Sequence, residues 1–338
     1  MKDYRLTQLA QELGVSKSTV SKVLNHCGGV DTELRRRILR SAKAFAEDST
    51  ADTCTVYGIL PDTPSFFWRE MRRGLADGVK NEPHTCKCNI YSELHDEETV
   101  LSYLAEAERM NVQVIIIAAS VTPAIHEKLT ALRPGRLILL LSEYYALANA
   151  FYVGSDAYRD GQEMGRLFAA SLRGGKPLLV SHTENYNVRE RIRGFRDVLA
   201  AEAPSLYENI TMLELDVEIF SARKLMPSHF AAQLSRRVSS VREDVVGLYF
   251  PMGFLQLPLA VKKVKTEKTI YCFGLDCLSE GERDSGVYID CGQDVYLQGL
   301  TAMQAAVRFA TCGEYPPQKR ILVPSRFYLP HGGEMGRQ

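Results

Sequence analysis

The sequence predicts a small all-α domain followed by a larger α/β body with parallel sheets, and three observations support this fold class. The first forty-five residues contain short amphipathic segments separated by turn signals. From residue 55 onward, short apolar runs alternate with amphipathic stretches of helical length, as in parallel sheets that helices cover on both faces. The composition is that of an ordinary globular chain with room for two or three domains: 338 residues, of which 45% are hydrophobic and 24% are charged.

The N-terminal segment has the pattern of a helix-turn-helix. A first helix is predicted by apolar residues at i, i+3, i+4 and i+7: Leu6, Leu9, Ala10 and Leu13. Gly14 ends this helix, and Ser16 is suited to cap the next one, because its hydroxyl can accept a hydrogen bond from a free amide of the first turn. The inner face of the second helix is formed by Val20, Val23 and Leu24. Asp31 can cap a third helix. A helix-turn-helix can lay its second helix in the major groove of DNA.

Charge is unevenly distributed along the chain. The 41 basic and 41 acidic side chains balance, but residues 1–45 carry nine basic and four acidic groups, so a net charge of +5 there is offset by −5 in the remainder. A basic segment joined to an acidic body favours a polyanionic partner for the first segment. The second helix leaves a polar row on its outer side, short enough to approach bases and phosphates: Lys17, Ser18, Thr19, Ser21 and Lys22. A three-helix module that docks onto another protein would also show a solvated polar face.

The run from Leu6 to Asn25 resembles the headpiece of the LacI (lactose-repressor) family. It contains the pattern Gly-Val-Ser-x-x-Thr-Val-Ser-x-Val-x-Asn, which is specific among helix-turn-helix proteins. The resemblance implies double-stranded operator DNA as the partner, with Lys17, Ser18 and Lys22 as base readers. It also implies phosphate contacts from Ser16, Thr19, Ser21 and Asn25. The whole candidate DNA-binding set is Thr7, Ser16, Lys17, Ser18, Thr19, Ser21, Lys22, Asn25 and Thr32.

One segment departs from the family pattern. Family members usually follow the third helix with a Tyr-x-Pro-Asn-x-x-Ala-x-x-Leu hinge, whose leucine wedges into the minor groove and kinks the operator. Residues 44–53 contain neither proline nor leucine, and they carry three carboxylates: Glu47, Asp48 and Asp52. Phosphates repel carboxylates, and no apolar wedge is present. We therefore expect a helix-turn-helix domain at 1–46 and a short linker at 47–54 in which the hinge helix is missing.

The body of the chain is predicted from its alternating pattern. Strands are expected at Thr55–Leu60, Val114–Ala118, Leu137–Leu141, Pro177–Ser181, Val245–Phe250 and Thr269–Phe273. Helices are expected at Phe67–Asn81, Asp96–Met110, Pro123–Leu132, Arg159–Leu172, Val188–Ala201 and Ser221–Arg242. This order is typical of parallel sheets covered on both faces. Because residues 55–338 are many for one open sheet, we expect two α/β lobes with a cleft between them.

Residues 55–338 resemble the periplasmic-binding-protein-like core that follows LacI-family headpieces. The motifs that carry the resemblance are Gly58–Asp62 with the aromatic triplet at 66–68 and Gly74, Asp156 with Gly161 and Gly165, Arg189–Phe195, Phe273–Asp276, and Gln293 six residues before Gly299. The resemblance implies an effector-binding and dimerisation domain of two lobes, with crossovers near 152–158, 276–292 and 313–322.

An effector site is expected at the carboxyl ends of the strands, where ligands of two-lobed α/β proteins bind. An aromatic platform and polar side chains there would suit a sugar: Arg189 and Arg191 are forked donors, Asp276 is an acceptor, and Gln293 is both. The candidate effector-binding set is Asp62, Phe66, Phe67, Trp68, Ser142, Arg189, Arg191, Asp276 and Gln293. The alternatives are core packing for the aromatic residues, a solvated helix start for the arginines, and a helix cap for Asp276.

Two departures limit the choice of ligand. Relatives that hold pentoses or hexoses commonly place Asn-Asp after the strand that here continues into Pro251–Gly253, and many have Asp where this chain has Ser142. A less hydroxylated ligand, a modified sugar or a cyclitol is therefore expected.

Other classes of protein are less consistent with the sequence. It contains no dinucleotide or phosphate-binding loop, no nucleophile elbow, no His-Glu-x-x-His pair and no Cys-x-x-Cys pair, so we expect no enzyme, no cofactor and no metal. No apolar run reaches the roughly 20 residues of a membrane span, and the N-terminus lacks a signal core. The expected protein is a cytoplasmic, homodimeric, sequence-specific transcription regulator, a repressor controlled by a carbohydrate-like effector. The alternatives are a sugar sensor or solute-binding protein without a role on DNA, and an α/β enzyme.

The linker yields a first prediction. Without an apolar wedge, binding should leave operator DNA nearly straight. Fluorescence energy transfer between dyes at the two ends of a bound operator fragment should change little on addition of protein. A sharp central kink with residues 47–54 inserted between base pairs would contradict this expectation.

Overall fold

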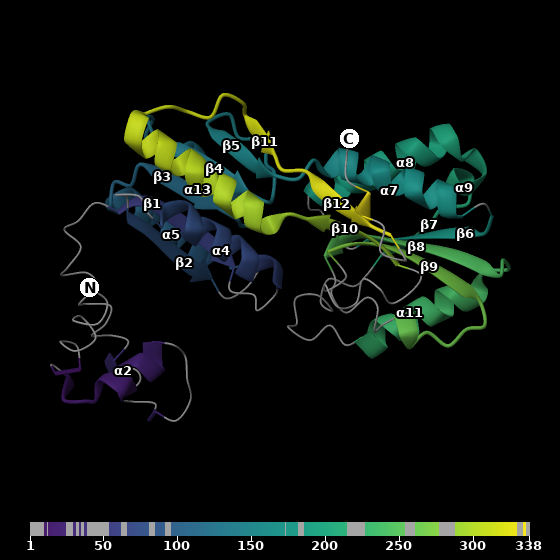
Figure 1. Cartoon of the computed structure of the whole chain (residues 1–338), viewed down its shortest axis with the longest axis horizontal. Coiled ribbons are helices and arrows are strands. Elements are labelled where there is room, and N and C mark those ends of the chain that lie inside the picture. Colours follow the sequence, from purple (N-terminus) through teal and green to yellow (C-terminus); the bar gives the residue numbers. More distant parts are fainter. Residues whose placement is uncertain are drawn as a thin grey trace. The chain divides into compact units, whose positions relative to one another are not determined.

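The computed structural model divides into two compact units, Met1–Cys54 and Thr55–Gln338, which are described separately (Figure 1). The structure describes residues 10–11, 13–24, 30–31, 34, 37–38, 54–61, 66–80, 85–91, 96–172, 174–181, 186–214, 227–253, 261–276, 288–329 and 334–335.

In the first unit, helix α2 (Lys17–Leu24) follows a helical turn that contains Ala10 and Leu13. Gly14, at φ +66°, ends the earlier helix in the left-handed conformation. Its amide donates to Gln11 O (3.2 Å) and the next amide, of Val15, donates to Ala10 O (3.0 Å), the pair of bonds that closes a glycine-ended helix. The predicted turn at Gly14 is confirmed.

A small apolar core holds α2 in place. Val20 and Val23 are completely buried together with Ala10 and Ile38. The Asp31 carboxylate accepts the Leu34 amide (3.1 Å), so it caps the third helical segment as expected. Several predicted features of this unit lie outside the described residues: Leu6, Thr7, Leu9, Asn25, Thr32 and all of the linker except Cys54.

Lobe 1 of the second unit is built on a six-stranded sheet in the order β11-β5-β4-β3-β1-β2. Its strands are β1 (Cys54–Pro61), β2 (Thr85–Tyr91), β3 (Val114–Ile117), β4 (Leu137–Leu141), β5 (Ala150–Gly154) and β11 (Arg320–Leu322). Its helices are α4 (Phe66–Val79), α5 (Glu97–Arg109), α6 (Pro123–Thr130) and α13 (Val295–Cys312). The recorded pairings β1–β3, β3–β4, β4–β5 and β5–β11 are all parallel.

Helices lie on both faces of this sheet. Met71 of α4 and Met303 of α13 share one apolar cluster with alternate residues of β1, β3 and β4. On the other face, the Tyr57 hydroxyl donates to Glu106 of α5 (2.8 Å). Every residue of β3 and β4 is buried, which explains why both strands are continuous apolar runs in the sequence.

Lobe 2 is built on a seven-stranded sheet in the order β13-β12-β10-β9-β8-β6-β7. Its strands are β6 (Lys176–Ser181), β7 (Thr211–Glu214), β8 (Val245–Gly253), β9 (Thr269–Leu275), β10 (Tyr288–Gln293), β12 (Ser325–Tyr328) and β13 (Glu334–Met335). Its helices are α7 (Ala157–Ser171), α8 (Tyr186–Glu202), α9 (Pro204–Glu208) and α11 (Pro227–Ser240). The pairs formed by β12 are antiparallel, whereas the pairs among β6 to β10 are parallel.

Neighbouring residues of β8 point to opposite faces of this sheet. Leu248 packs with Leu234 of α11, and Tyr249 packs with Phe195 of α8. The rings of Tyr249 and Phe195 are stacked, with centroids 4.2 Å apart. Figure 1 shows α7 and α8 on one side of the sheet and α11 on the other.

The chain passes between the two sheets at three places, after β5, after β10 and after β11. Strand β10 continues through Gln293, so the second passage comes after the expected stretch 276–292. Strand β11 continues to Leu322, so the third passage comes after the expected stretch 313–322. Both passages thus follow directly on the expected stretches, and neither β10 nor β11 was among the strands expected from the sequence.

The largest element without a sequence prediction is α13. Its 18 residues include one charged side chain, Arg308, and it packs against both the lobe 1 sheet and α4. Its buried residues recur along one face, from Val295 through Ala302 to Phe309, but with a single charge on the exposed face the contrast between the two faces is weak in the sequence. Among the described residues, every helix is too short or too polar to span a bilayer.

Glycine allows α7 and α8 to approach closely. A Cβ at Gly161 would lie 2.1 Å from the Arg191 carbonyl oxygen, and one at Gly194 would lie 2.1 Å from the Tyr158 carbonyl oxygen. Asp156 caps α7 by accepting the Arg159 amide (3.2 Å). The Asp-x-x-x-x-Gly spacing therefore combines a helix start with a helix contact.

We predict that Gly161→Ala lowers the free energy of unfolding by about 1–3 kcal/mol, because the methyl group would force the two backbones apart. Gly174→Ala is the matched control, since a Cβ there meets nothing within 4 Å. Denaturant unfolding of both variants checks this, and equal stability of the two would contradict the packing argument.

Candidate functional site

The outer face of α2 is the first candidate site. Lys17, Ser18 and Lys22 are exposed, whereas Val20 and Val23 on the opposite side are completely buried. The helix contains two lysines and no carboxylate. Apolar residues thus anchor one side of α2 while cationic and hydroxyl groups face solvent on the other, an arrangement suited to phosphates and base edges.

The start of α2 is fixed by hydroxyl groups. Ser16 Oγ accepts the Thr19 amide (3.1 Å), as expected for a cap. The same oxygen shares hydrogen bonds with the hydroxyls of Ser18 (2.8 Å) and Thr19 (2.7 Å). These bonds place three hydroxyls at the positive end of the helix, where an anion is favoured. The assignment of individual residues to bases or phosphates stays a prediction.

The second candidate site lies at the carboxyl ends of β9 and β10 in lobe 2. Asp276 follows β9 and Gln293 ends β10, and because these strands are parallel neighbours, both residues lie at one edge. The backbone amide of Gln293 donates to Asp276 Oδ1 (2.8 Å), and the side-chain Nε2 of Gln293 donates to Asp276 Oδ2 (2.7 Å). The structure therefore brings together two residues that the sequence singled out.

Asp276 is held in an unusual backbone conformation. Its φ is +47°, and its own amide donates to Cys291 O (3.1 Å). Burial raises the pKa of Asp276 to about 6, while the hydrogen bonds from Gln293 and the charge of Arg191 oppose the rise. The Asp276 carboxylate is fixed in position by Gln293, and a polar ligand that donated hydrogen bonds to it would offset part of the cost of its burial.

Arg191 completes this polar edge. It is 5% exposed, and it donates from Nη1 to Pro251 O (3.3 Å) and from Nη2 to Ser155 Oγ (3.5 Å). Its buried Nε has no hydrogen-bond partner among the described residues. Arg191 thus connects α8, the end of β8 and the first passage between sheets, and it keeps a donor for a further acceptor.

A hydrogen bond connects the two lobes at this edge. Asn187, in the first turn of α8, donates to the carbonyl oxygen of Ser142, which follows β4 at φ +69°. Beside it, the rings of Tyr144 and Tyr186 have centroids 4.7 Å apart. Ser142 therefore lies at the carboxyl edge of lobe 1 against a residue of lobe 2.

Asn187 and Glu143 carry no sequence motif that singles them out. Glu143 follows Ser142, and its carboxylate accepts the Tyr145 hydroxyl (2.9 Å). Burial raises the pKa of Glu143. The only sequence signal for either residue is its place directly after a strand or at the start of the helix that follows one, where α/β proteins bind their ligands.

The remaining candidate residues are placed differently. Arg189 is exposed and lies about 200° around α8 from the buried Arg191. Phe67 and Trp68 are partly buried against the lobe 1 core, with ring centroids 5.0 Å apart, so their contacts are those of core packing. Phe66 is 46% exposed, and Asp62 lies outside the described residues.

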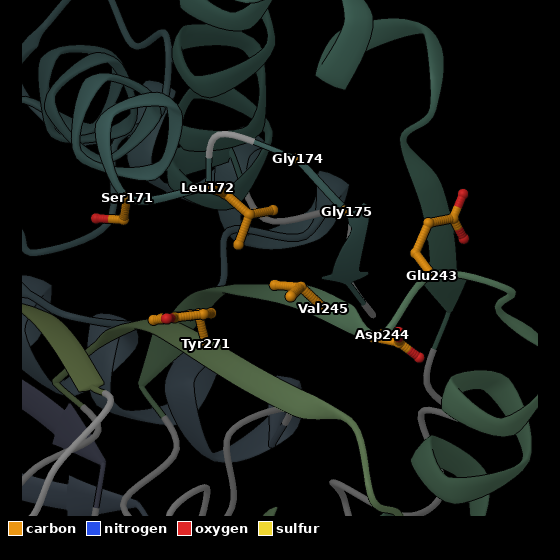
Figure 2. Close-up of a pocket in the computed structure, with 8 residues that line it drawn as sticks. All are labelled: Ser171, Leu172, Gly174, Gly175, Glu243, Asp244, Val245 and Tyr271. Carbon is orange, nitrogen blue, oxygen red and sulfur yellow. The ribbon is translucent and has the colours of Figure 1, made fainter.

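A hollow of about 330 Å³ lies at the opposite edge of the lobe 2 sheet. Figure 2 shows it between the end of α7 and the starts of β6 and β8. Its lining includes the carboxylates of Glu243 and Asp244 and no basic side chain. Because it is at the amino ends of these strands, it is not where open parallel sheets bind ligands.

Comparison with known proteins identifies the N-terminal segment. Residues 5–45 match the model described as bacterial regulatory proteins, lacI family. Residues 5–45 form a LacI-family helix-turn-helix domain. The match confirms the resemblance that the motif around Gly14 and Ser16 indicated. No curated protein matches the chain in sequence.

Solved structures share the fold of most of the chain. A LacI-family transcriptional regulator from Silicibacter pomeroyi aligns with a TM-score of 0.59 and 17% identity over 95% of this chain and 97% of that one. A putative LacI transcriptional regulator from Bacteroides fragilis aligns with a TM-score of 0.64 and 14% identity over 82% and 96%. A solute-binding protein of an ABC transporter from Burkholderia graminis, solved with D-arabinose, aligns with a TM-score of 0.67 and 14% identity over 82% and 96%. These likenesses confirm the predicted fold class.

We predict that Asp276→Asn changes how stability depends on pH. A carboxyl with a raised pKa binds more protons in the folded state, so its contribution to stability falls as pH rises from about 4 to about 6 and is constant above that range. The free energy of unfolding of Asp276→Asn, relative to the natural protein, should therefore increase between pH 4 and pH 6. Urea titrations at closely spaced pH values measure the difference, and parallel curves would contradict burial of an ionisable Asp276.

Proposed function

We propose that this protein is a sequence-specific DNA-binding transcription regulator, a repressor, and that a small carbohydrate-like effector controls its affinity for DNA. The observation that carries the proposal is a LacI-family helix-turn-helix domain with an exposed cationic helix face on the same chain as a two-sheet α/β unit. Regulation of DNA binding gives both units a role, and it requires neither catalysis nor a bound cofactor.

The DNA-binding face in this proposal is the outer side of α2. Lys17 and Lys22 neutralise phosphates or reach base edges, and the buried valines fix the orientation of the helix. Two headpieces, brought together in a homodimer, would read the two halves of a pseudo-palindrome with one α2 in each half-site. The protein would act in the cytoplasm, where chromosomal DNA is accessible.

The effector site in this proposal is the polar edge around Asp276. Gln293 and Asp276 provide a rigid donor and acceptor pair, and Arg191 provides a buried cation with an unused donor. The solute-binding protein solved with D-arabinose supports a sugar-like ligand for this fold. The apolar end of β8, Pro251 and Met252, supports a modified sugar or a cyclitol, because it offers no side-chain hydroxyl partner.

Control of DNA binding would act through the contact between lobes. The bond from Asn187 to the Ser142 carbonyl lies beside the proposed effector site. An effector that contacts both lobes shifts the equilibrium between two arrangements of the lobes. The size of this shift is limited by the difference between the effector's affinities for the two arrangements.

A second candidate function is that of a sugar sensor or solute-binding protein without a role on DNA. The fold shared with the arabinose-bound solute-binding protein favours it. The LacI-family domain at residues 5–45 favours regulation instead, because a solute binder has no use for a helix-turn-helix.

The proposal is tested with two variants of the full chain, each the control for the other. We expect Lys22→Ala to weaken binding to a promoter fragment by about tenfold, through loss of a charged contact, while it keeps the thermal shift caused by the effector. Asp276→Asn should keep DNA affinity without ligand and lose the thermal shift. Fluorescence anisotropy with fragments from the neighbourhood of the gene, and a screen of sugars, cyclitols and sugar acids, provide the two measurements.

Lys80→Ala removes an exposed lysine from the second unit and should change neither result. Equal DNA affinity of the Lys22→Ala and Lys80→Ala proteins would disprove the role of α2. An unchanged effector shift in Asp276→Asn would disprove the proposed effector site.

A further inference from the structure

A separate pocket of about 350 Å³ lies in lobe 1, beside its edge strand β11. It is formed where the connection from β4 to β5 meets the start of β11. Its lining consists of Leu140, Tyr144, Tyr145, Ala146, Leu147, Ala148, Ala150, Phe151, Tyr152, Lys319 and Arg320. The lining therefore has two cations and no carboxylate, and the remainder is aromatic or aliphatic. None of these residues belongs to the proposed effector set.

The Arg320 side chain contacts two aromatic rings in the pocket. Its guanidinium lies 4.8 Å from the centroid of the Tyr144 ring and 5.7 Å from that of Tyr152. Its buried Nε has no hydrogen-bond partner, and within the part of the chain that the structure describes it forms no ion pair with an acidic side chain. Arg320 is half-buried, and only its Nε is fully covered, so the rest of its forked donor group stays accessible to an external anion.

The second cation of the pocket, Lys319, also lies over an aromatic ring. Lys319 Nζ lies 4.1 Å from the centroid of the Phe151 ring and donates to the carbonyl oxygen of Ala148 (2.9 Å). Two carboxylates close to lining residues in the sequence are not part of the lining: Glu143 accepts the Tyr145 hydroxyl, and Glu314 pairs with Arg308. The positive charge of the pocket is therefore not balanced by its own walls.

The apolar walls restrict the rest of the ligand. Phe151 is fixed in place, because its ring stacks on Tyr315, with centroids 5.8 Å apart and planes at 18°, and also contacts Lys319 Nζ. Leu140 and Leu147 add aliphatic surface. Flat aromatic walls with a forked cation at one side match a flat apolar body that carries one oxyanion, because arginine binds carboxylate and phosphate with two parallel hydrogen bonds.

The pocket shares a wall with the contact between the lobes. The hydroxyl of Tyr152 donates to Ser155 O (3.0 Å), in the first passage between the sheets, and it also lies 3.4 Å from Ser142 O. Tyr144 packs on Tyr186, the first residue of α8. A ligand that displaces either tyrosine would therefore disturb the Ser142 contact between the lobes.

We propose that the pocket around Arg320, Tyr144 and Tyr152 is a second binding site, for a small oxyanion on a flat apolar body, and that its occupancy modulates the response to the effector. The binding site stands independently of the function proposed above, whereas the modulation rests on it.

Direct binding tests the site on the full chain by isothermal titration. The probes are benzoate, phenyl phosphate, inorganic phosphate and benzyl alcohol. Benzoate or phenyl phosphate should bind, and whichever binds identifies the oxyanion. Inorganic phosphate should bind more weakly because it has no flat apolar body, and benzyl alcohol should bind more weakly because it has no oxyanion. Absence of binding by both aryl anions would overturn the proposal.

Substitutions then locate the bound anion. Arg320→Met should weaken binding of the anion by about tenfold or more. Arg133→Met, which removes an exposed arginine elsewhere in lobe 1, should leave the affinity unchanged. Ala146→Trp fills the pocket from an exposed position and should abolish binding even if Arg320→Met folds poorly. Unchanged affinity in the Ala146→Trp protein would show that the anion binds elsewhere.

Modulation is measured separately. The bound aryl anion should shift the midpoint of the effector titration in the natural protein and leave it unchanged in Ala146→Trp. An anion that binds at Arg320 without moving this midpoint would overturn the modulation and not the site. Unweakened DNA binding in Lys22→Ala, or an unchanged effector shift in Asp276→Asn, would count against the proposed function and not against the Arg320 site, so the two failures are distinguishable.

Discussion

Parallel strand order is the constraint on which the second unit depends, because it brings the carboxyl ends of neighbouring strands to one edge of each sheet. Asp276 and Gln293 are 17 residues apart in the chain and become hydrogen-bonded neighbours only because β9 and β10 run side by side in the same direction. The same arrangement places Pro251, at the end of β8, within reach of Arg191. The polar edge is thus a consequence of topology.

Burial of charge at this edge has an energetic cost that the structure compensates only in part. The Arg191 guanidinium is buried with two neutral acceptors, Ser155 and Pro251, and its charge acts on Asp276. A buried charge is expensive unless it is paired and hydrogen-bonded. An Asp276 pKa of about 6 is the measurable sign of incomplete compensation. Incompletely compensated polar groups are characteristic of binding sites, where a ligand supplies the missing partners.

In the LacI-family domain, the main physical constraint is the stability of the short helix α2. A helix of eight residues is too short to be stable alone, so α2 depends on the buried Val20 and Val23, on the Ser16 cap and on the turn at Gly14. All of this stabilisation comes from the inner side and the ends of the helix. The outer side is therefore free to carry lysines and hydroxyls whose contribution is to recognition and not to folding.

Local signals in the sequence determined the features that depend on a few consecutive residues. They include the turn at Gly14, the caps at Ser16 and Asp31, six of the strands (β1, β3, β4, β6, β8 and β9) and the motif that identifies the first domain. Asp276, Gln293 and Arg191 were recognisable as candidates, because their motifs have characteristic spacings. Helix α13 was not, because its exposed face carries a single charged residue, Arg308, and so contrasts little in sequence with its buried face.

Tertiary structure alone decided which side chains meet across the chain. It separated Arg191 from Arg189, packed Trp68 on the core, joined Asn187 to Ser142 and placed Arg320 over the rings of Tyr144 and Tyr152. The physical reason is that periodicity reports which face of an element is buried but not which distant element covers it. Contacts between residues more than a hundred positions apart, such as Arg320 and Tyr152, arise only when distant strands, here β11 and β5, pair in one sheet.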